Sequence, residues 1–209
     1  MRFLARSLGP TILLLLGLVP ALPAQTSAGK TRAQLQALFD AHKGDFDYLL
    51  GDWQFTAENK QYGKFGGFWS AVRLAGEGQV LDEFRVVGDS GQTYDLSSTL
   101  RTYSALRDRW ELVSVDEPNG LQDLGTGRRV GNEVHIEQTF GVGGPSPSTF
   151  RIRYYDIGPD HFSWVGDRSK DGGKTWVKDF YRIEAHRIGP PRAITPLTHS
   201  TAKAAPADR

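Results

Sequence analysis

Residues 121–140 read LQDLGTGRRVGNEVHIEQTF, two strand-like segments separated by a tight turn. In the second segment His135 and Glu137 fall on one face, because side chains along a strand alternate with a period of two. Gly131-Asn132 between the segments is a typical turn sequence. Because a parallel crossover needs a dozen or more residues, the two segments are predicted to be antiparallel neighbours.

The same pattern of strands and short turns extends in both directions along the chain. Turn sequences such as Gly76-Glu77-Gly78, Pro118-Asn119-Gly120 and Asp171-Gly172-Gly173 separate nearly every pair of segments. Consecutive hairpins form a meander, and closing a meander into a barrel removes its exposed edges. The sequence therefore predicts an all-β fold, an antiparallel up-and-down β-barrel of about ten strands with one short N-terminal helix. The expected strands are 53–61, 68–75, 79–87, 94–105, 109–116, 121–129, 133–140, 148–156, 161–168 and 175–187, and the glycine-rich segments 62–67 and 141–147 are interpreted as loops that act as portal flaps.

The composition excludes several classes of protein. Of the 209 residues, 39% are apolar, 23% charged and 11% aromatic, which is typical of a globular domain. The formal net charge of +1 gives no electrostatic reason to expect nucleic acid or an anionic membrane as partner. The absence of cysteine excludes disulfides, thiolate metal sites and cysteine nucleophiles.

The two ends of the sequence differ from the strand-rich region between them. Residues 1–24 combine Arg2 and Arg6, a short apolar run and small residues, which predicts a secretory signal peptide cleaved after Ala21 or Ala24. The run is too short for a membrane anchor, so we expect a periplasmic or secreted product with no stable membrane insertion. Residues 25–44 contain a helix that Thr31 caps and Gly44 ends. The barrel is expected over 45–188, and 189–209 is expected to be a disordered tail.

One motif carries a resemblance to a known superfamily. The segment 46–53, FDYLLGDW, ends in Gly51-Asp52-Trp53, a Gly-x-Trp that opens the first strand after an apolar turn. It resembles the hallmark of lipocalins and the wider calycin superfamily. With Arg101-Thr102-Tyr103 and the segment 169–176, the pattern is similar to a family of bacterial exported lipocalin-like proteins of unknown function. The resemblance implies a barrel with a cavity, and a last-strand arginine packed over Trp53, for which Arg182 is the candidate.

The segment 169–176, SKDGGKTW, resembles the Asp-box of sialidase propellers. Propellers repeat such hairpins around a ring, and this sequence has one copy. We therefore interpret it as a turn in which Asp171 accepts backbone amides and Trp176 packs beneath, without glycosidase chemistry.

The histidines do not predict a metal or cofactor site. His135 and Glu137 share a strand face, but two such ligands do not make a metal site. Haem-binding barrels of the nitrobindin type use a histidine near the end of the chain, to which His186 is comparable. Those barrels carry Gly-x-Trp-x-Gly-x-Gly, whereas here Gln54-Phe55-Thr56-Ala57 follows the tryptophan, so no cofactor is expected.

Arginine and aromatic residues alternate on several predicted strands, and those that face the lumen are candidates to bind a ligand. Inward arginines would face a carboxylate or phosphate on an otherwise apolar molecule. The alternative is that these arginines lie on the outer surface, paired with acids such as Glu83, Asp95, Glu111 or Glu137. The candidate ligand-binding residues are Arg101, Tyr103, Trp110, Arg151, Arg153 and Trp164.

Three functions remain open from the sequence. The first is an extracytoplasmic protein that holds a small, largely apolar molecule in the barrel, and this molecule either carries or lacks an anionic group. The second is a small isomerase, cyclase or lyase that uses the same cavity by acid–base catalysis, with Tyr103, His135, Glu137 or an inward arginine as its groups. The third is a filled barrel that acts through its surface. The residues on the strand faces that line the lumen decide between these three functions.

Overall fold

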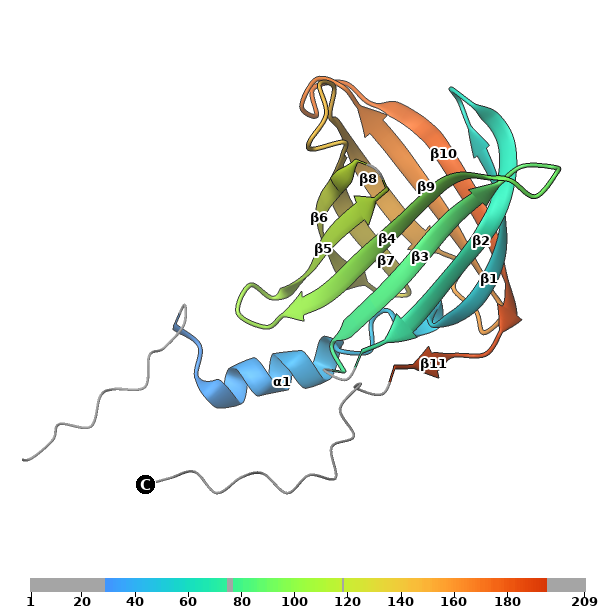
Figure 1. The fold of residues 1–209 in the computed structure, drawn as a ribbon. Helices are drawn as coiled ribbons and strands as arrows, with labels where there is room; N and C mark the ends of the chain where they lie inside the picture. The colour runs from blue at the N-terminus through green and yellow to red at the C-terminus, as the bar shows by residue number, and fades with distance from the viewer. Residues whose placement is uncertain (1–28, 75–76, 118, 195–209) are drawn as a thin grey trace, which may run out of the picture.

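The computed structural model describes residues 29–74, 77–117 and 119–194, and it contains a closed antiparallel barrel (Figure 1). Strands β1 to β10 pair with their neighbours in sequence, and β1 also pairs with β10, which closes the cylinder. The predicted ten-stranded up-and-down barrel is therefore confirmed. The strands are β1 (Gly51–Asn59), β2 (Gly63–Arg73), β3 (Gln79–Val87), β4 (Thr93–Ser104), β5 (Arg109–Asp116), β6 (Gly120–Val130), β7 (Glu133–Phe140), β8 (Ser148–Tyr155), β9 (His161–Ser169), β10 (Val177–Gly189) and β11 (Arg192–Ala193).

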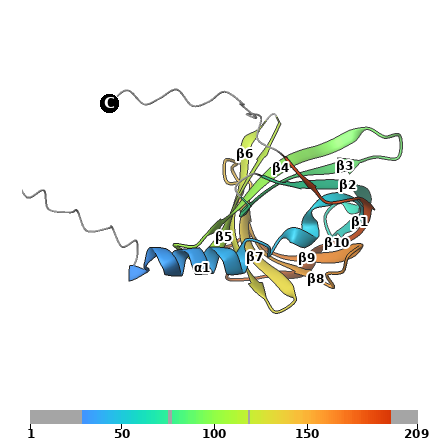
Figure 2. The same cartoon turned by 90° about the horizontal axis from the view of Figure 1, so that it is seen from below.

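The helix α1 (Arg32–His42) precedes the barrel and begins at the predicted cap. Thr31 Oγ1 accepts from the amide of Gln34 at 3.2 Å, and Gln34 Oε1 accepts from the amide of Thr31 at 2.8 Å. This capping box satisfies two amide groups that a helix start leaves free. Seen from below, α1 extends away from the barrel (Figure 2), and none of its residues is buried. Among the described helices, none has the length and hydrophobicity that crossing a bilayer requires.

Alternation of side chains along the strands builds the core inside the cylinder. In β1, Trp53, Phe55 and Ala57 are buried and point inward, while the residues between them are less buried. Inward glycines leave room where neighbouring strands approach closely. A Cβ atom on Gly67 would collide with the carbonyl oxygen of Arg85, so this position of β2 admits no side chain.

The segment between α1 and β1 closes one end of the barrel. It contains the single turn η2 (Asp47–Leu49), which lies within the ring of strands in Figure 2. Phe46 and Leu49 are fully buried there, and the rings of Phe46 and Trp110 meet edge to face with 4.8 Å between centroids. We call this the sealed end. The segment 46–50 therefore acts as a plug that enters the cylinder before β1 begins at Gly51.

The opposite end of the barrel is open. Along the inward face of β4, Tyr103 and Arg101 are buried, Thr99 is 9% exposed, Ser97 is half-buried and Asp95 is exposed. Because inward side chains lose burial in this direction, solvent reaches the lumen from the end where the β3–β4 and β5–β6 turns lie. We call this the open end.

Two expectations about segment boundaries need correction. The glycine-rich segment 62–67 is mostly strand, because β2 begins at Gly63 and pairs with β1. The tail does not begin at Gly189, because Arg192 and Ala193 pair in parallel with β2. Arg192 also pairs with Asp52 at 2.6 Å, which holds the returning chain against the barrel. The predicted signal peptide, 1–24, and residues 195–209 lie outside the described residues.

Candidate functional site

Trp53 is packed under an arginine, but not the one predicted. The guanidinium of Arg187, on β10, lies over the indole ring with 4.1 Å from Cζ to the ring centroid. Arg182 is about half exposed and pairs with Asp179 at 2.6 Å. The prediction for Arg182 is therefore wrong. In the register between β1 and β10, Arg182 lies opposite Glu58 and faces outward, whereas Arg187 lies opposite Trp53 at the sealed end.

Gly51 of the Gly-x-Trp motif has a steric reason to be glycine. Its φ is +107°, and a Cβ atom there would lie 2.6 Å from both Arg187 Nη1 and the carbonyl oxygen of Gly189. A side chain at this position would displace the arginine from Trp53. The motif therefore belongs to the sealed end and not to a ligand site.

A buried ion pair lies inside the lumen above the sealed end. Asp82 of β3 and Arg101 of β4 are in contact, and their side chains are 1% and 4% exposed. Trp69 Nε1 donates to Asp82 Oδ1 at 2.7 Å, and Arg101 Nη2 donates to the Tyr154 hydroxyl at 3.4 Å. Within the described residues Arg101 Nε has no hydrogen-bond partner, which leaves one donor for water or a ligand.

A second cluster of polar side chains, besides the Asp82–Arg101 pair, lies nearer the open end on strands β4 to β7. The hydroxyls of Thr99 and Ser114 are 2.9 Å apart. Asp123 accepts from the amide of Gly141 at 3.2 Å and from Gln138 Nε2 at 3.3 Å. Burial raises the pKa of Asp123 to about 6, in spite of these two donors. This carboxyl therefore changes charge close to neutral pH.

The Asp82–Arg101 pair and this second cluster of polar side chains face a common cavity of about 80 Å³ within the barrel. Aromatic side chains form much of the rest of its wall. The cavity residues are Trp69, Asp82, Phe84, Ser97, Thr99, Arg101, Ser114, Asp123, Gln138, Phe140, Ile152, Tyr154, Trp164, Tyr181 and Ile183. The lumen is thus partly vacant, and its lining is aromatic with a few convergent polar groups, as is usual for small-molecule sites.

Four of the six predicted ligand-binding residues face the lumen, and two of these line the cavity. Arg101 and Trp164 do so. Tyr103 and Trp110 face inward at the sealed end, where the Tyr103 hydroxyl donates to Asp108 at 2.6 Å and Trp110 Nε1 donates to Asp45 at 3.2 Å. Burial, followed by the Asp108 carboxylate, raises the pKa of Tyr103 far above its usual value. These two residues therefore close the barrel and do not line its cavity.

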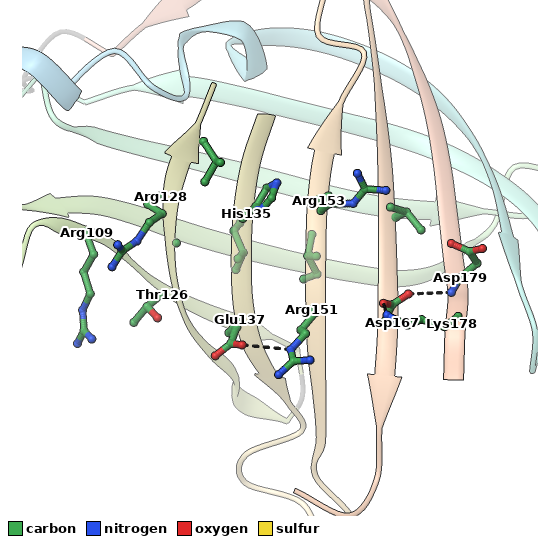
Figure 3. Close-up of a pocket in the computed structure, with 15 residues that line it drawn as sticks. Arg109, Thr126, Arg128, His135, Glu137, Arg151, Arg153, Asp167, Lys178 and Asp179 are labelled. Atoms are coloured by element: carbon green, nitrogen blue, oxygen red, sulfur yellow. Dashed lines mark hydrogen bonds and ion pairs between the residues drawn. The ribbon is translucent and has the colours of Figure 1, made fainter. Parts of the chain in front are cut away.

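Arg151 and Arg153 lie on the outside of β8, so their assignment as ligand-binding residues is wrong, and the alternative of surface arginines paired with acids is correct. Both line a pocket of about 710 Å³ on the outer wall. Figure 3 shows Arg151 beside Glu137 there. Arg151 pairs with Glu137 at 3.2 Å, and Arg153 with Glu133 at 3.3 Å. The alternation Phe150, Ile152, Tyr154 takes the buried face of β8, which leaves both arginines to solvent and to acids on β7.

His135 and His186 also lie away from the lumen. His135 contacts Glu133 at 2.6 Å on the outer wall, and His186 is exposed on the outer face of β10. Within the described ranges no three His, Asp or Glu side chains converge as metal ligands.

The segment 169–176 forms the predicted turn between β9 and β10. Asp171 accepts from the amides of Lys174 and Thr175, at 3.0 and 2.9 Å, and from the Thr175 hydroxyl at 2.6 Å. Trp176 packs outside the barrel, with Arg151 Cζ 4.2 Å from its ring centroid. The motif is a structural turn in this protein.

Sequence reasoning missed Asp82 and Asp123, the two carboxyls of the cavity. Asp82 was detectable, because alternation along β3 puts it on the same face as Val80 and Phe84. Asp123 was harder to assign, since an irregularity between Ser114 and Val115 shifts the β5–β6 register just before it.

The closed barrel of ten antiparallel strands agrees with the barrel that the resemblance to lipocalins implies. No protein-family model matches the sequence, and no curated protein does. The chain is similar in structure to the crystal structure of Rv2717c from M. tuberculosis, with a TM-score of 0.50 and 16% identity over 72% of this chain and 97% of that one. It is also similar to EF1p2_mFAP2b bound to DFHBI, with a TM-score of 0.38 and 13% identity over 70% and 99% of the two chains. At these identities the likeness concerns the fold alone.

Proposed function

We propose that this protein binds a small, largely apolar molecule in the lumen of the barrel, which the molecule enters through the open end. The observation that carries the proposal is the cavity of about 80 Å³ above the plug of 46–50. Its wall is aromatic with a few polar side chains, and the open end gives a ligand access to it. The polar groups on its wall give a ligand a defined orientation.

The size of the cavity limits the ligand. A volume of about 80 Å³ is small beside ordinary ligand pockets of roughly 300–1,000 Å³. The enclosed part of the ligand is therefore a group of only a few non-hydrogen atoms. A larger molecule would extend past Phe84, Phe140 and Tyr181 toward the open end.

An anionic ligand has little support. Arg151 and Arg153 lie outside, and Arg101 is neutralised by its contact with Asp82. A buried arginine with such a partner attracts an anion only weakly. We therefore propose binding through apolar contact and hydrogen bonds, and not through an unpaired guanidinium.

Binding is a better proposal than catalysis. The enzyme alternative relies on Tyr103, His135, Glu137 or an inward arginine for its acid, base or oxyanion support. Tyr103 is held by Asp108 at the sealed end, and His135 and Glu137 lie on the outer wall. The inward arginine, Arg101, is paired with Asp82. They do not meet around one reacting atom, as acid–base catalysis requires.

Adjacent serines on β4 provide a matched test of binding. Ser97 lines the cavity, whereas Ser98 faces outward. Native mass spectrometry of protein purified from its natural source should detect a retained small molecule. The Ser97→Leu variant fills the cavity mouth and should lose that molecule, while Ser98→Leu should keep it. A wild-type chain without any bound mass, or equal retention by both variants, would contradict the proposal.

We also propose that the protein is periplasmic or secreted, and that it is one of the bacterial exported lipocalin-like proteins. The support is the sequence of residues 1–24 and the motifs around Trp53 and Arg101. Expression of the full chain in a Gram-negative host, followed by fractionation and intact-mass measurement, tests the location. The expected product is extracytoplasmic and lacks 21 or 24 residues. A full-length product in the cytoplasm would contradict the proposal.

A further inference from the structure

The cavity in the lumen is lined by more negatively charged than positively charged side chains. Three charged side chains line the cavity: Asp82, Arg101 and Asp123. The first two are in contact and cancel each other. Asp123 has neutral donors, the Gly141 amide and Gln138, so its charge has no counter-ion among the groups that line the cavity.

Further carboxyls adjoin Asp123 on the same wall toward the open end. Asp116 lies on β5 and accepts from Gln122 at 3.0 Å, and Asp95 lies on β4. Burial raises the pKa of Asp123, and the Asp116 charge adds to this effect. The β4–β6 wall therefore has an excess of negative charge at the place where a ligand enters.

A further arginine near the open end, Arg168, already has other contacts. Arg168 of β9 lies over the ring of Phe180, with 3.5 Å from Cζ to the centroid, and donates to Gln61 Oε1 at 3.0 Å. Asp123 lies on β6, and β7 and β8 separate that strand from β9. Arg168 is not among the residues that line the cavity with Asp123.

The aromatic wall of the cavity adds to the attraction for a cation. Trp164 and Tyr181 meet edge to face at 5.0 Å between centroids, as do Trp69 and Phe84 at 5.2 Å. All four rings line the cavity that Asp123 faces. The faces of aromatic rings attract cations, and this attraction is stronger in a desolvated site.

We infer that the lumen selects ligands with a protonated amine, whose ammonium group is held by Asp123 and the aromatic wall. This inference rests on the proposed function, because it names the chemical class of the molecule that occupies the same cavity. An ammonium would supply the missing counter-ion and donate to the free lone pairs of the carboxylate. Its alkyl part would pack among the rings.

The test uses three probes of nearly equal size and different charge: isobutylamine, isobutanol and isobutyrate. At pH 7.5 the amine is protonated, the alcohol neutral and the acid anionic. Binding to the full chain is followed by NMR through the indole N–H signals. Trp69 and Trp164 line the cavity, whereas Trp53 and Trp110 at the sealed end and Trp176 in the turn provide internal controls.

We expect isobutylamine to shift the Trp69 and Trp164 signals and to bind at least about tenfold more tightly than isobutanol, with isobutyrate weakest. In Asp123→Asn the amine should lose this advantage, and the alcohol should be unchanged within about threefold. The matched control is Glu137→Gln, which removes a carboxylate from the outer wall of β7 and should change nothing.

The possible failures are distinguishable. If the alcohol or the acid binds in the cavity as tightly as the amine, binding in the lumen stands but the amine inference is overturned. The same holds if Asp123→Asn leaves the preference intact. If none of the probes shifts the Trp69 and Trp164 signals, both the inference and the proposed cavity function are rejected. The comparison of probes uses the wild-type chain, so it decides the question even if Asp123→Asn does not fold.

Discussion

Arg187 covers Trp53 and ties three parts of the chain together at the sealed end. Besides lying 4.1 Å from the indole centroid, its guanidinium donates to the carbonyls of Leu50 at 2.6 Å and Tyr48 at 3.1 Å. Its Nε donates to the carbonyl of Pro159 at 2.7 Å. One side chain thus joins the last long strand, the plug and the β8–β9 turn, so it fixes the closure of the barrel.

Removing this side chain should destabilise the barrel strongly. We expect Arg187→Ala to lower the free energy of unfolding by about 2–4 kcal/mol, through the lost cation–π contact and the unpaired carbonyls. Arg182→Ala, on the same strand but exposed, should change it by less than about 0.5 kcal/mol. Urea unfolding at pH 7 measures both. Equal losses in the two variants would refute the assignment of Arg187.

The Asp82–Arg101 pair should behave as a buried unit. Arg101→Met leaves a buried carboxylate without its counter-ion and should cost about 3–5 kcal/mol of unfolding free energy. The double variant Asp82→Asn/Arg101→Met should recover part of that loss, because neither charge remains. Urea unfolding of the single and double variants gives the coupling energy. Additive losses would show that the two side chains do not interact.

Asp123 should make the stability fall as the pH rises. Its pKa is raised by burial to about 6 from the ordinary 3.8. Between pH of about 4 and 6 the folded state keeps a proton that the unfolded chain has lost, so the free energy of unfolding decreases with pH in this window. Asp123→Asn removes the buried charge. At pH 7.5 it should be more stable than wild type by about 1–3 kcal/mol, and at pH 4 about equally stable.

Urea unfolding at the two pH values checks the Asp123 prediction. Glu137→Gln serves as the control, because that carboxylate lies on the outer wall, and it should differ little from wild type at either pH. The explanation would be wrong if Asp123→Asn lost stability at pH 7.5, or if its difference from wild type did not change with pH.

The Asp171 carboxylate should titrate at low pH because of the turn that it organises. The hydrogen bond from the Thr175 hydroxyl, then the Thr175 amide, lowers its pKa to about 2. Thr175→Val should raise this pKa toward 3.8, whereas Thr175→Ser should preserve it. The contribution of the turn to stability is present above pH of about 4 and is lost as the pH falls through 2. A carboxyl-detected NMR titration measures the pKa, and an unchanged value in Thr175→Val would reject the hydrogen bond.

The sequence predicted the strands well but not which residues face a ligand. Seven of the glycine- and proline-bounded segments, including 79–87 and 133–140, agree with the observed strands to within one residue at each end. For β8 the sequence left both faces open, since Arg151 and Arg153 alternate with Phe150, Ile152 and Tyr154. Packing of the three large apolar side chains decided that question, and it placed the arginines outside.

Local sequence determined the elements of this protein: the capped helix, the hairpin turns and the tryptophan that opens the first strand. These depend on backbone preferences and on contacts between residues near in the chain, which a sequence displays directly. Only the tertiary structure selected Arg187 over Arg182, paired Asp82 with Arg101 and left Asp123 without a counter-ion. Closing the barrel sets the register between strands distant in sequence, and a shift of one residue exchanges the inner face for the outer one.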